Sequence, residues 1–302
     1  MTLRDLRWRA EAALLRLVVA GLRSLSPVAA SNLGGAVGRA VGPLLPVSRV
    51  ADRNLLLALP ELDRAARRRV VRGVWDNLGR TAAEIVQLDR LGRSDSDAGW
   101  EVEGDAHARL VAAHPGPVIL VSAHLGNWEV LGRVAGEYGI QLAAVYRAGS
   151  NPHVEAMVTR LRVAGAFGTM RMFPKGAAGA RQAIGHLRGN GRLVLLIDQK
   201  MNDGIAARLF GHAAMTAPAA AALALRTGAL LVPTFCRRLG PARMLAVCEA
   251  PLPLPDSGDR AADVAALTQA INDRLEAWIR AQPQDWLWLH RRWPREIYGS
   301  ET

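Results

Sequence analysis

The chain has 302 residues, of which 50% are hydrophobic and 22% are charged. This composition is too apolar for a disordered chain, and its apolar stretches are too often interrupted for a protein with many membrane spans. The 38 basic residues outnumber the 27 acidic ones, which gives a formal net charge of +11, and all the basic residues except Lys175 and Lys200 are arginines. A biased genomic base composition would explain why arginine is preferred over lysine, but it would not explain the positive net charge. That charge favours an anionic partner such as nucleic acid, anionic lipid or an acidic carrier protein.

The first predicted element is an amphipathic helix over residues 3–26, which Pro27 ends. No uncharged run within it reaches 18 residues, and an arginine in the middle of a bilayer is costly. We therefore expect this helix to lie in the membrane interface rather than to cross the membrane, unless it packs on the protein's own core. No signal-peptide pattern is present, and Cys236 and Cys248 form no CxxC pair, so the sequence predicts a protein of the reducing cytosolic side.

The pattern stays helical to about residue 105. Small residues in the segment 31–46 suit close helix packing, and a second helix is predicted over residues 66–91. We expect residues 1–105 to form a helical, membrane-associated cap. Residues 106–302 are then expected to form the α/β domain, the two parts making one globule.

From residue 115 onward, short β-branched runs alternate with helical stretches. A helix after Asn151 has Pro152 at its first position, and a long loop is predicted from the end of residues 192–198 to Met215. The predicted strands are 117–123, 141–147, 168–173, 192–198, 229–236 and 244–249, and the other helices are 127–138, 177–187, 217–226 and 261–281. This alternation predicts an α/β fold with a mixed central sheet and helices on both faces.

Several familiar motifs are missing from the chain. It contains neither GxxxxGK[ST] nor a GxGxxG that opens a helix after a strand, which argues against nucleotide chemistry. It also lacks GxSxG, so the nucleophile elbow of the α/β-hydrolases is excluded.

One hexapeptide, HLGNWE at 124–129, indicates chemistry. His124 follows a buried strand, and Glu129 falls near the start of the next helix. The turn between them can bring the carboxylate back to the imidazole, so that the other ring nitrogen takes a proton from a hydroxyl. The helix N-terminus could bind an oxyanion or a phosphate, although the spacing alone also fits an ordinary loop histidine.

The hexapeptide and several later blocks together resemble the late (lauroyl/myristoyl) acyltransferases of lipid A biosynthesis, within the lysophospholipid acyltransferase superfamily. The resemblance runs over nearly the whole chain. Its other blocks are YRAGSNP at 146–152, Asp198-Gln199, LFGHAAMTAP at 209–218, RTGALLVP at 226–233 and WLWLHRRWP at 286–294.

The resemblance implies transfer of a fatty acyl chain from acyl carrier protein to a hydroxyl of an anionic lipid A precursor, at the cytoplasmic face of the inner membrane. His124 would be the general base and Glu129 would orient it. The residues expected to bind substrate are Asn127, Arg147, Asp198 and Gln199. The implied reaction needs neither a metal nor a cofactor, and no nucleic acid is expected as a partner.

The departures from the superfamily pattern limit this assignment. Many members have aspartate where this chain has Glu129, and a proline-glutamate-glycine block where it has DQK at 198–200, which favours the lipid A branch over glycerolipid synthesis. Related actinobacterial mannoside acyltransferases share the pattern, so the acceptor could be another glycolipid or a lysophospholipid.

Two functions of a different class are compatible with the same residues. The same dyad with water as acceptor would make a thioester hydrolase, and a basic membrane-surface or nucleic-acid-binding module would need no chemistry. Arg147 could simply end a strand, and Asp198 could be an ordinary cap. Trp286, Trp288 and Trp293 fit either a core or a lipid-headgroup interface.

Overall fold

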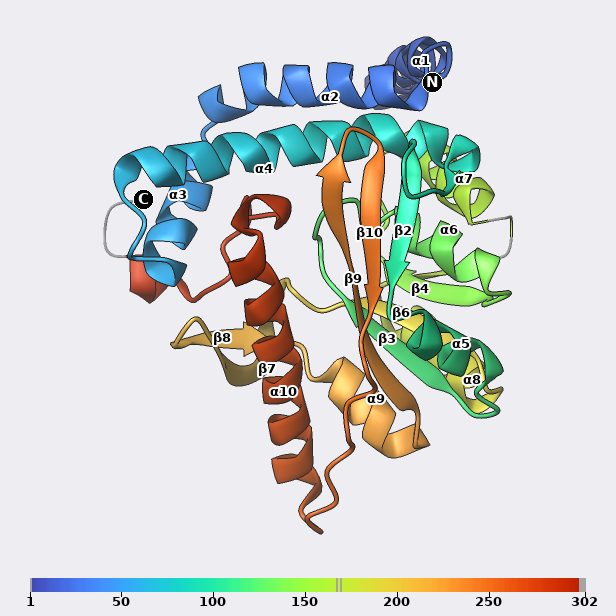
Figure 1. The fold of residues 1–302 in the computed structure, drawn as a ribbon, viewed down its shortest axis with the longest axis vertical. Coiled ribbons are helices and arrows are strands. Elements are labelled where there is room, and N and C mark those ends of the chain that lie inside the picture. The colour runs from blue at the N-terminus through green and yellow to red at the C-terminus, as the bar shows by residue number, and fades with distance from the viewer. Residues whose placement is uncertain (1, 167, 169, 299–302) are drawn as a thin grey trace.

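A computed structural model describes residues 2–166, 168 and 170–298 of the chain. It has an α/β fold whose central sheet is mixed and flanked by helices, as the sequence predicts (Figure 1). The sheet has eight strands in the order β1-β2-β10-β9-β3-β6-β4-β5. The strands are β1 (Gly92–Arg93), β2 (Gly99–Glu103), β3 (Val118–Ser122), β4 (Leu142–Tyr146), β5 (Arg171–Pro174), β6 (Arg192–Leu196), β9 (Leu230–Gly240) and β10 (Arg243–Cys248).

The middle of the sheet brings two chain segments together at one edge. All five residues of β3 are buried, and β3 pairs in parallel with both β6 and β9, which suits its continuous apolar sequence. The pairing aligns Ser122 with Leu196, so both strands end at the same edge. The residues that follow them, up to His124 and Asp198, therefore meet although 74 positions separate them.

Helices cover both faces of the sheet. One face packs against α8 (Ala177–Arg188), α9 (Ala219–Thr227) and α10 (Arg260–Ala281), whose buried side chains belong to the largest core cluster. The other face packs against α5 (Asp105–Ala113) and α6 (Val130–Glu137). The helix α7 (Pro152–Gly165) has Asn151 as its N-cap, whose side-chain oxygen accepts from the backbone of His153 and Val154, as predicted.

Four helices precede the sheet: α1 (Leu3–Arg23), α2 (Pro27–Val41), α3 (Ser48–Ala58) and α4 (Arg64–Glu84). Figure 1 shows α4 lying across the edge of the sheet at which β9 ends, with α2 outside it. The short 3-10 helix η1 (Gly42–Leu44) extends α2, and η2 (Ile85–Arg90) follows α4. None of the helices in the described part of the chain combines the length and the apolar character needed to cross a membrane.

The structure differs from the sequence prediction in several places. The predicted helix over 66–91 is α-helical only to Glu84. The strands β1 and β2 lie within residues 1–105, so the sheet starts inside the expected helical cap. The predicted loop to Met215 contains a two-stranded antiparallel ribbon of β7 (Lys200–Leu209) and β8 (His212–Thr216). The sequence does not predict this ribbon, because its small residues show little alternation of apolar and polar side chains.

Two further segments complete the comparison. The predicted strand over residues 168–173 is observed at Arg171–Pro174, and residue 169 lies outside the described residues. After α10, the chain forms the 3-10 helices η3 (Pro283–Asp285) and η4 (Arg295–Tyr298) on either side of the tryptophan-rich tail.

Candidate active site

The centre of the site is a hydrogen-bonded pair of His124 and Asp198. Nδ1 of His124 lies 2.9 Å from Oδ1 of Asp198, and the backbone N–H of His124 donates to Oδ2 of the same carboxylate at 3.2 Å. The Asp198 side chain is fully buried, whereas 17% of the His124 side chain is exposed. Because Nδ1 donates to the carboxylate, the lone pair of the neutral ring is on Nε2, and no hydrogen bond joins Nε2 to another described residue.

The tail completes the surroundings of Asp198. Nε1 of Trp286 donates to Oδ2 of Asp198 at 2.9 Å, and Nε2 of His290 donates to the Asp198 carbonyl at 3.3 Å. The backbone N–H of Leu287 donates to the His124 carbonyl, so the tail also holds the chain at the histidine. Trp286 and His124 together satisfy a carboxylate that would otherwise be costly to bury.

The charges of the pair shift both pKa values. Burial by itself would raise the pKa of Asp198, but His124, His290 and Trp286 stabilise the carboxylate and hold that pKa well below its usual range. Burial also disfavours the charged form of His124, but Asp198 outweighs it, so the pKa of His124 is raised above its ordinary value. Glu129 adds to this rise, and Arg162 opposes it.

Glu129 does not make the contact that the sequence predicts. Both of its carboxylate oxygens accept from Arg162 of α7, at 2.6 to 3.1 Å, and Nε1 of Trp128 donates to Oε1. No hydrogen bond between Glu129 and His124 is found in the described part of the chain. The orienting contact on Nδ1 comes from Asp198, which corrects the predicted pairing, because β6 places Asp198 directly beside the end of β3.

The Asn127 side chain points into the protein, where a substrate cannot reach it. Its side chain is completely buried, and Nδ2 donates to Oε2 of Glu84 at 2.7 Å while Oδ1 accepts from the backbone of Glu129. The predicted substrate contact is therefore wrong for Asn127. It shapes the turn from inside the protein.

Glu84 is the centre of a buried polar network beneath this turn. Arg238 of β9 donates to both of its carboxylate oxygens, at 2.6 and 2.9 Å, and Ser31 Oγ and the backbone N–H of Ala242 also donate to it. Burial would raise the pKa of Glu84, but Arg238 and the other donors lower it overall. The network thus joins α2, α4 and β9 to the turn that carries His124.

Helix α4 also binds the backbone of the turn directly. The Gly126 carbonyl accepts from Asn77 Nδ2 at 2.9 Å and from Thr81 Oγ1 at 3.1 Å, while the Gly126 N–H donates to the Asp285 carbonyl. Gly126 has a φ of 53°, and a Cβ there would overlap the backbone of Cys236. Only glycine fits this position, which fixes the direction of the turn.

The N-terminus of α6 offers less than the sequence predicts. The N–H groups of Glu129, Val130 and Leu131 donate to the Asn127 side chain, the Asn127 carbonyl and the Trp128 carbonyl respectively. Amides that already have acceptors are not free to bind an oxyanion or a phosphate. The predicted anion site at these three amides is therefore wrong.

The two remaining predicted residues lie at the surface around the pair. Arg147 follows β4 and Gln199 follows Asp198, and both side chains are exposed. Because β4 is next to β6, Arg147 projects from the same edge of the sheet as His124. Their exposure is compatible with the predicted contacts to a substrate but does not test them.

A small apolar cavity of about 40 Å³ lies under α6. Leu131, Val134 and Ala135 of α6 and the following Tyr138 line it, and residues of β2, β3, β4, β6, β9, β10 and α5 complete its wall. Leu131 is two positions from Glu129, so one residue of the cavity wall follows directly on the turn that carries His124.

Sequence reasoning missed Arg162 and Glu84, and it assigned the buried Asp198 to substrate binding, whereas Asp198 binds His124. Trp286, Trp288 and Trp293 are all fully buried, which answers the open question about the tail in favour of a core. Arg162 and Glu84 contact the turn from helices distant in sequence, and no spacing signals them. For Asp198, the available signal is its position at the end of a buried strand, but sequence alone does not give the order of the strands.

Comparisons with known proteins find similarity to acyltransferases of membrane lipids. The family model of the bacterial lipid A biosynthesis acyltransferases matches residues 6–295. A lipid A biosynthesis lauroyltransferase of Escherichia coli strain K12 is 26% identical over 261 residues, which are 83% of this chain and 80% of that protein.

Other relatives match a shorter part. A phosphatidylinositol mannoside acyltransferase of Mycobacterium tuberculosis is 34% identical over 113 residues, which are 37% of this chain, and the match spans about a third (34%) of the length of that relative. Among solved structures, a 1-acyl-sn-glycerophosphate acyltransferase from Thermotoga maritima aligns with 79% of this chain and 98% of its own at 12% identity. Its TM-score is 0.34, which is too low to support a statement about this chain.

Proposed function

Because the chain belongs to the bacterial lipid A biosynthesis acyltransferase family, we propose that it transfers a fatty acyl chain from a thioester to a hydroxyl of a membrane glycolipid. The proposed acceptor is an anionic lipid A precursor and the proposed donor is acyl carrier protein. The main support from the structure is the His124–Asp198 pair, whose Nε2 is left without a partner among the described residues.

In the proposed mechanism, Asp198 keeps the proton on Nδ1 of His124. Nε2 then takes the proton of the acceptor hydroxyl as its oxygen attacks the thioester carbonyl. The C–S bond breaks, and the leaving thiolate receives that proton back from Nε2. The negative charge of Asp198 stabilises the imidazolium that exists between the two transfers.

Glu129 and Arg162 have a supporting role in this proposal. Their ion pair is partly buried and adjoins the His124 ring through Trp128, whose ring lies edge-on to the imidazole at 4.9 Å. Glu129 adds negative charge near the imidazolium, and Arg162 holds that carboxylate in place. Arg147 and Gln199 are proposed to contact the anionic substrates at the exposed rim.

The cavity under α6 is the proposed site of the acyl chain. Its lining is almost entirely apolar, but a volume of about 40 Å³ holds only a few water molecules. A fatty chain would therefore enter only if α6 moved away from the sheet. We expect Leu131→Trp to block the chain and to favour shorter donors.

The choice of donor follows from charge and family. Acyl carrier proteins are small and acidic, so a chain with a net charge of +11 attracts them over a distance. We expect a higher kcat/KM with an acyl-carrier-protein thioester than with the matching coenzyme A thioester. This advantage should shrink as ionic strength rises past about 0.15 M, where the screening length is ~8 Å.

A second acceptor is favoured by one observation. The identity to phosphatidylinositol mannoside acyltransferases is 34% over 113 residues, so a mannosylated glycolipid is the alternative acceptor. The test gives purified protein one labelled thioester with a lipid A precursor, a phosphatidylinositol mannoside, a lysophospholipid or no acceptor. Labelled lipid A product that is lost in His124→Ala supports the proposal, whereas thioester loss without any acylated lipid would show a hydrolase and contradict it.

A further inference from the structure

The outer face of α2 has an unusual composition for a protein surface. Arg39 is the only charged residue between residues 27 and 48, and it is paired with Asp76 of α4. Four large apolar side chains form a stripe at helical spacing, with exposed fractions of 50%, 54%, 50% and 82% for Leu33, Val37, Val41 and Leu44. A contiguous exposed apolar face of this kind marks an interaction site on a folded protein.

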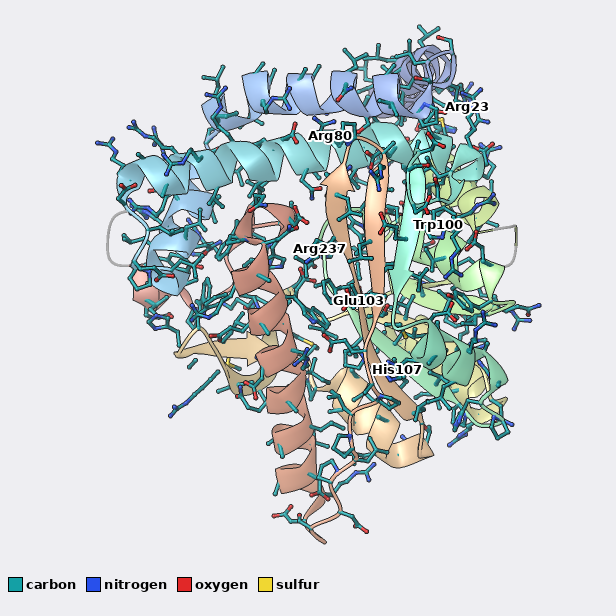
Figure 2. All side chains as sticks on the ribbon, viewed as in Figure 1. Arg23, Arg80, Trp100, Glu103, His107 and Arg237 are labelled. Carbon is teal, nitrogen blue, oxygen red and sulfur yellow. The ribbon has the colours of Figure 1, made fainter. Side chains whose placement is uncertain are left out.

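The inner face of α2 explains why the stripe points outward. Gly34 and Gly38 pack against the backbone of α4 at Trp75 and Gly79, where a Cβ on either glycine would overlap backbone atoms. Arg80 extends from α4 to Ser31 and Asn32 of α2, and Figure 2 shows it between the two helices. This close contact sets the rotation of α2, so the apolar stripe must face away from α4.

The neighbouring helix α1 is different in kind. The sequence predicts that it lies in the membrane interface, and its exposed leucines, such as Leu14 and Leu17, alternate with exposed arginines. It is also bound to the protein, because Asn151 Nδ2 donates to the Trp8 carbonyl and Arg23 pairs with Asp89. Exposed apolar surface with little charge therefore belongs to α2 and η1, whereas α1 exposes both apolar side chains and positive charge.

We propose that the stripe Leu33, Val37, Val41 and Leu44 inserts into the headgroup region of an anionic lipid bilayer, while the arginines of α1 contact lipid phosphates. This proposal rests on the proposed function only in supposing a lipid acceptor. Residues 1–53 carry eight arginines against three carboxylates, which complements an anionic surface. A second copy of the chain is the less suitable occupant, because it would bring the same arginines against one another.

The test uses the full-length protein and vesicles of phosphatidylethanolamine and phosphatidylglycerol in a 3:1 ratio. We expect Val37→Glu/Val41→Glu to weaken co-sedimentation at least about 10-fold, because two apolar side chains are replaced by charges that the lipid surface repels. The matched control is Leu110→Glu/Leu239→Glu, whose native side chains are 43% and 41% exposed elsewhere on the surface. The control should bind vesicles like the unmodified protein.

A second variant separates charge from insertion. Arg4→Gln/Arg9→Gln/Arg16→Gln should lose the preference for these vesicles over pure phosphatidylcholine vesicles, and thermal unfolding should show that every variant is folded. Equal vesicle binding by Val37→Glu/Val41→Glu and by the control would overturn the proposal. So would a dimer of the unmodified protein that this variant converts to a monomer.

The reaction is assayed separately with detergent-dispersed acceptor. If Val37→Glu/Val41→Glu abolishes vesicle binding but the unmodified protein transfers no acyl chain, the membrane-binding surface is supported and the proposed function is disproved. If the unmodified protein transfers the acyl chain in detergent but the variant still binds vesicles, the proposed function is supported and the membrane-binding surface is disproved.

Discussion

Glu84 and Asp198 are two fully buried carboxylates that each bind a residue of the turn carrying His124, and they differ in their other partners. Glu84 is saturated by a bidentate arginine, a hydroxyl, an amide side chain and a backbone N–H. Asp198 binds a histidine whose side chain still reaches solvent. The pKa of each carboxylate is lowered despite burial, because strong donors surround both.

Only one of these two buried charges can take part in acid–base chemistry. Arg238 cannot lose its proton in a protein, so the Glu84 pair fixes the geometry of the turn and nothing more. The imidazole of His124 can gain and lose a proton, so the charge of Asp198 acts on a group that can serve as a base. The predictions below test this division between a structural and a chemical carboxylate.

The largest effect is expected from His124→Ala. Removing the proposed general base should lower kcat by roughly 10²–10⁴-fold, and the loss of its hydrogen bond to the buried Asp198 should also lower the melting temperature. Steady-state acyl transfer and thermal unfolding measure the two quantities. His153→Ala, at an exposed position of α7, is the control and should retain full activity. Near-normal turnover by His124→Ala would disprove the proposed base.

Glu84→Gln should chiefly change stability. It leaves the Arg238 guanidinium buried without its counter-charge, which costs about 3–5 kcal/mol in the free energy of unfolding. Denaturant titration measures this loss. Glu101→Gln breaks a pair with Arg243 whose side chains are about a third exposed, so it should cost less than about 1 kcal/mol. Equal losses in the two variants would show that the Glu84 network does not hold the turn.

A smaller effect is expected at Glu129. Glu129→Gln should lower the rate less than His124→Ala and keep the fold, because it removes a charge near the imidazolium but leaves a hydrogen-bonding side chain. In a double-mutant cycle with Arg162→Ala, we expect a coupling of about 0.5–3 kcal/mol on kcat/KM. Strictly additive losses would mean that Arg162 does not act through Glu129.

Much of this arrangement follows from local sequence, and the rest depends on strand order. The apolar run of β3, the cap at Asn151 and the alternation of strands and helices predict the α/β fold and place His124 at a strand end. The partner of His124 could not be predicted, because Glu129 is close in sequence whereas Asp198 is close only once β3 and β6 pair. The same applies to Trp286 and Glu84, which reach the turn from the tail and from α4.

The most direct test of the His124–Asp198 pair is the pH dependence of kcat/KM. Asp198 raises the pKa of His124, Glu129 raises it less, and burial and Arg162 lower it. In the proposed mechanism neutral His124 is the base, so kcat/KM should rise with pH through a midpoint above about 6.5. In Asp198→Asn the midpoint should move to lower pH, because burial then dominates, and in Glu129→Gln it should move less. A larger shift in Glu129→Gln than in Asp198→Asn would contradict the account, because it would make Glu129 the main electrostatic partner of His124.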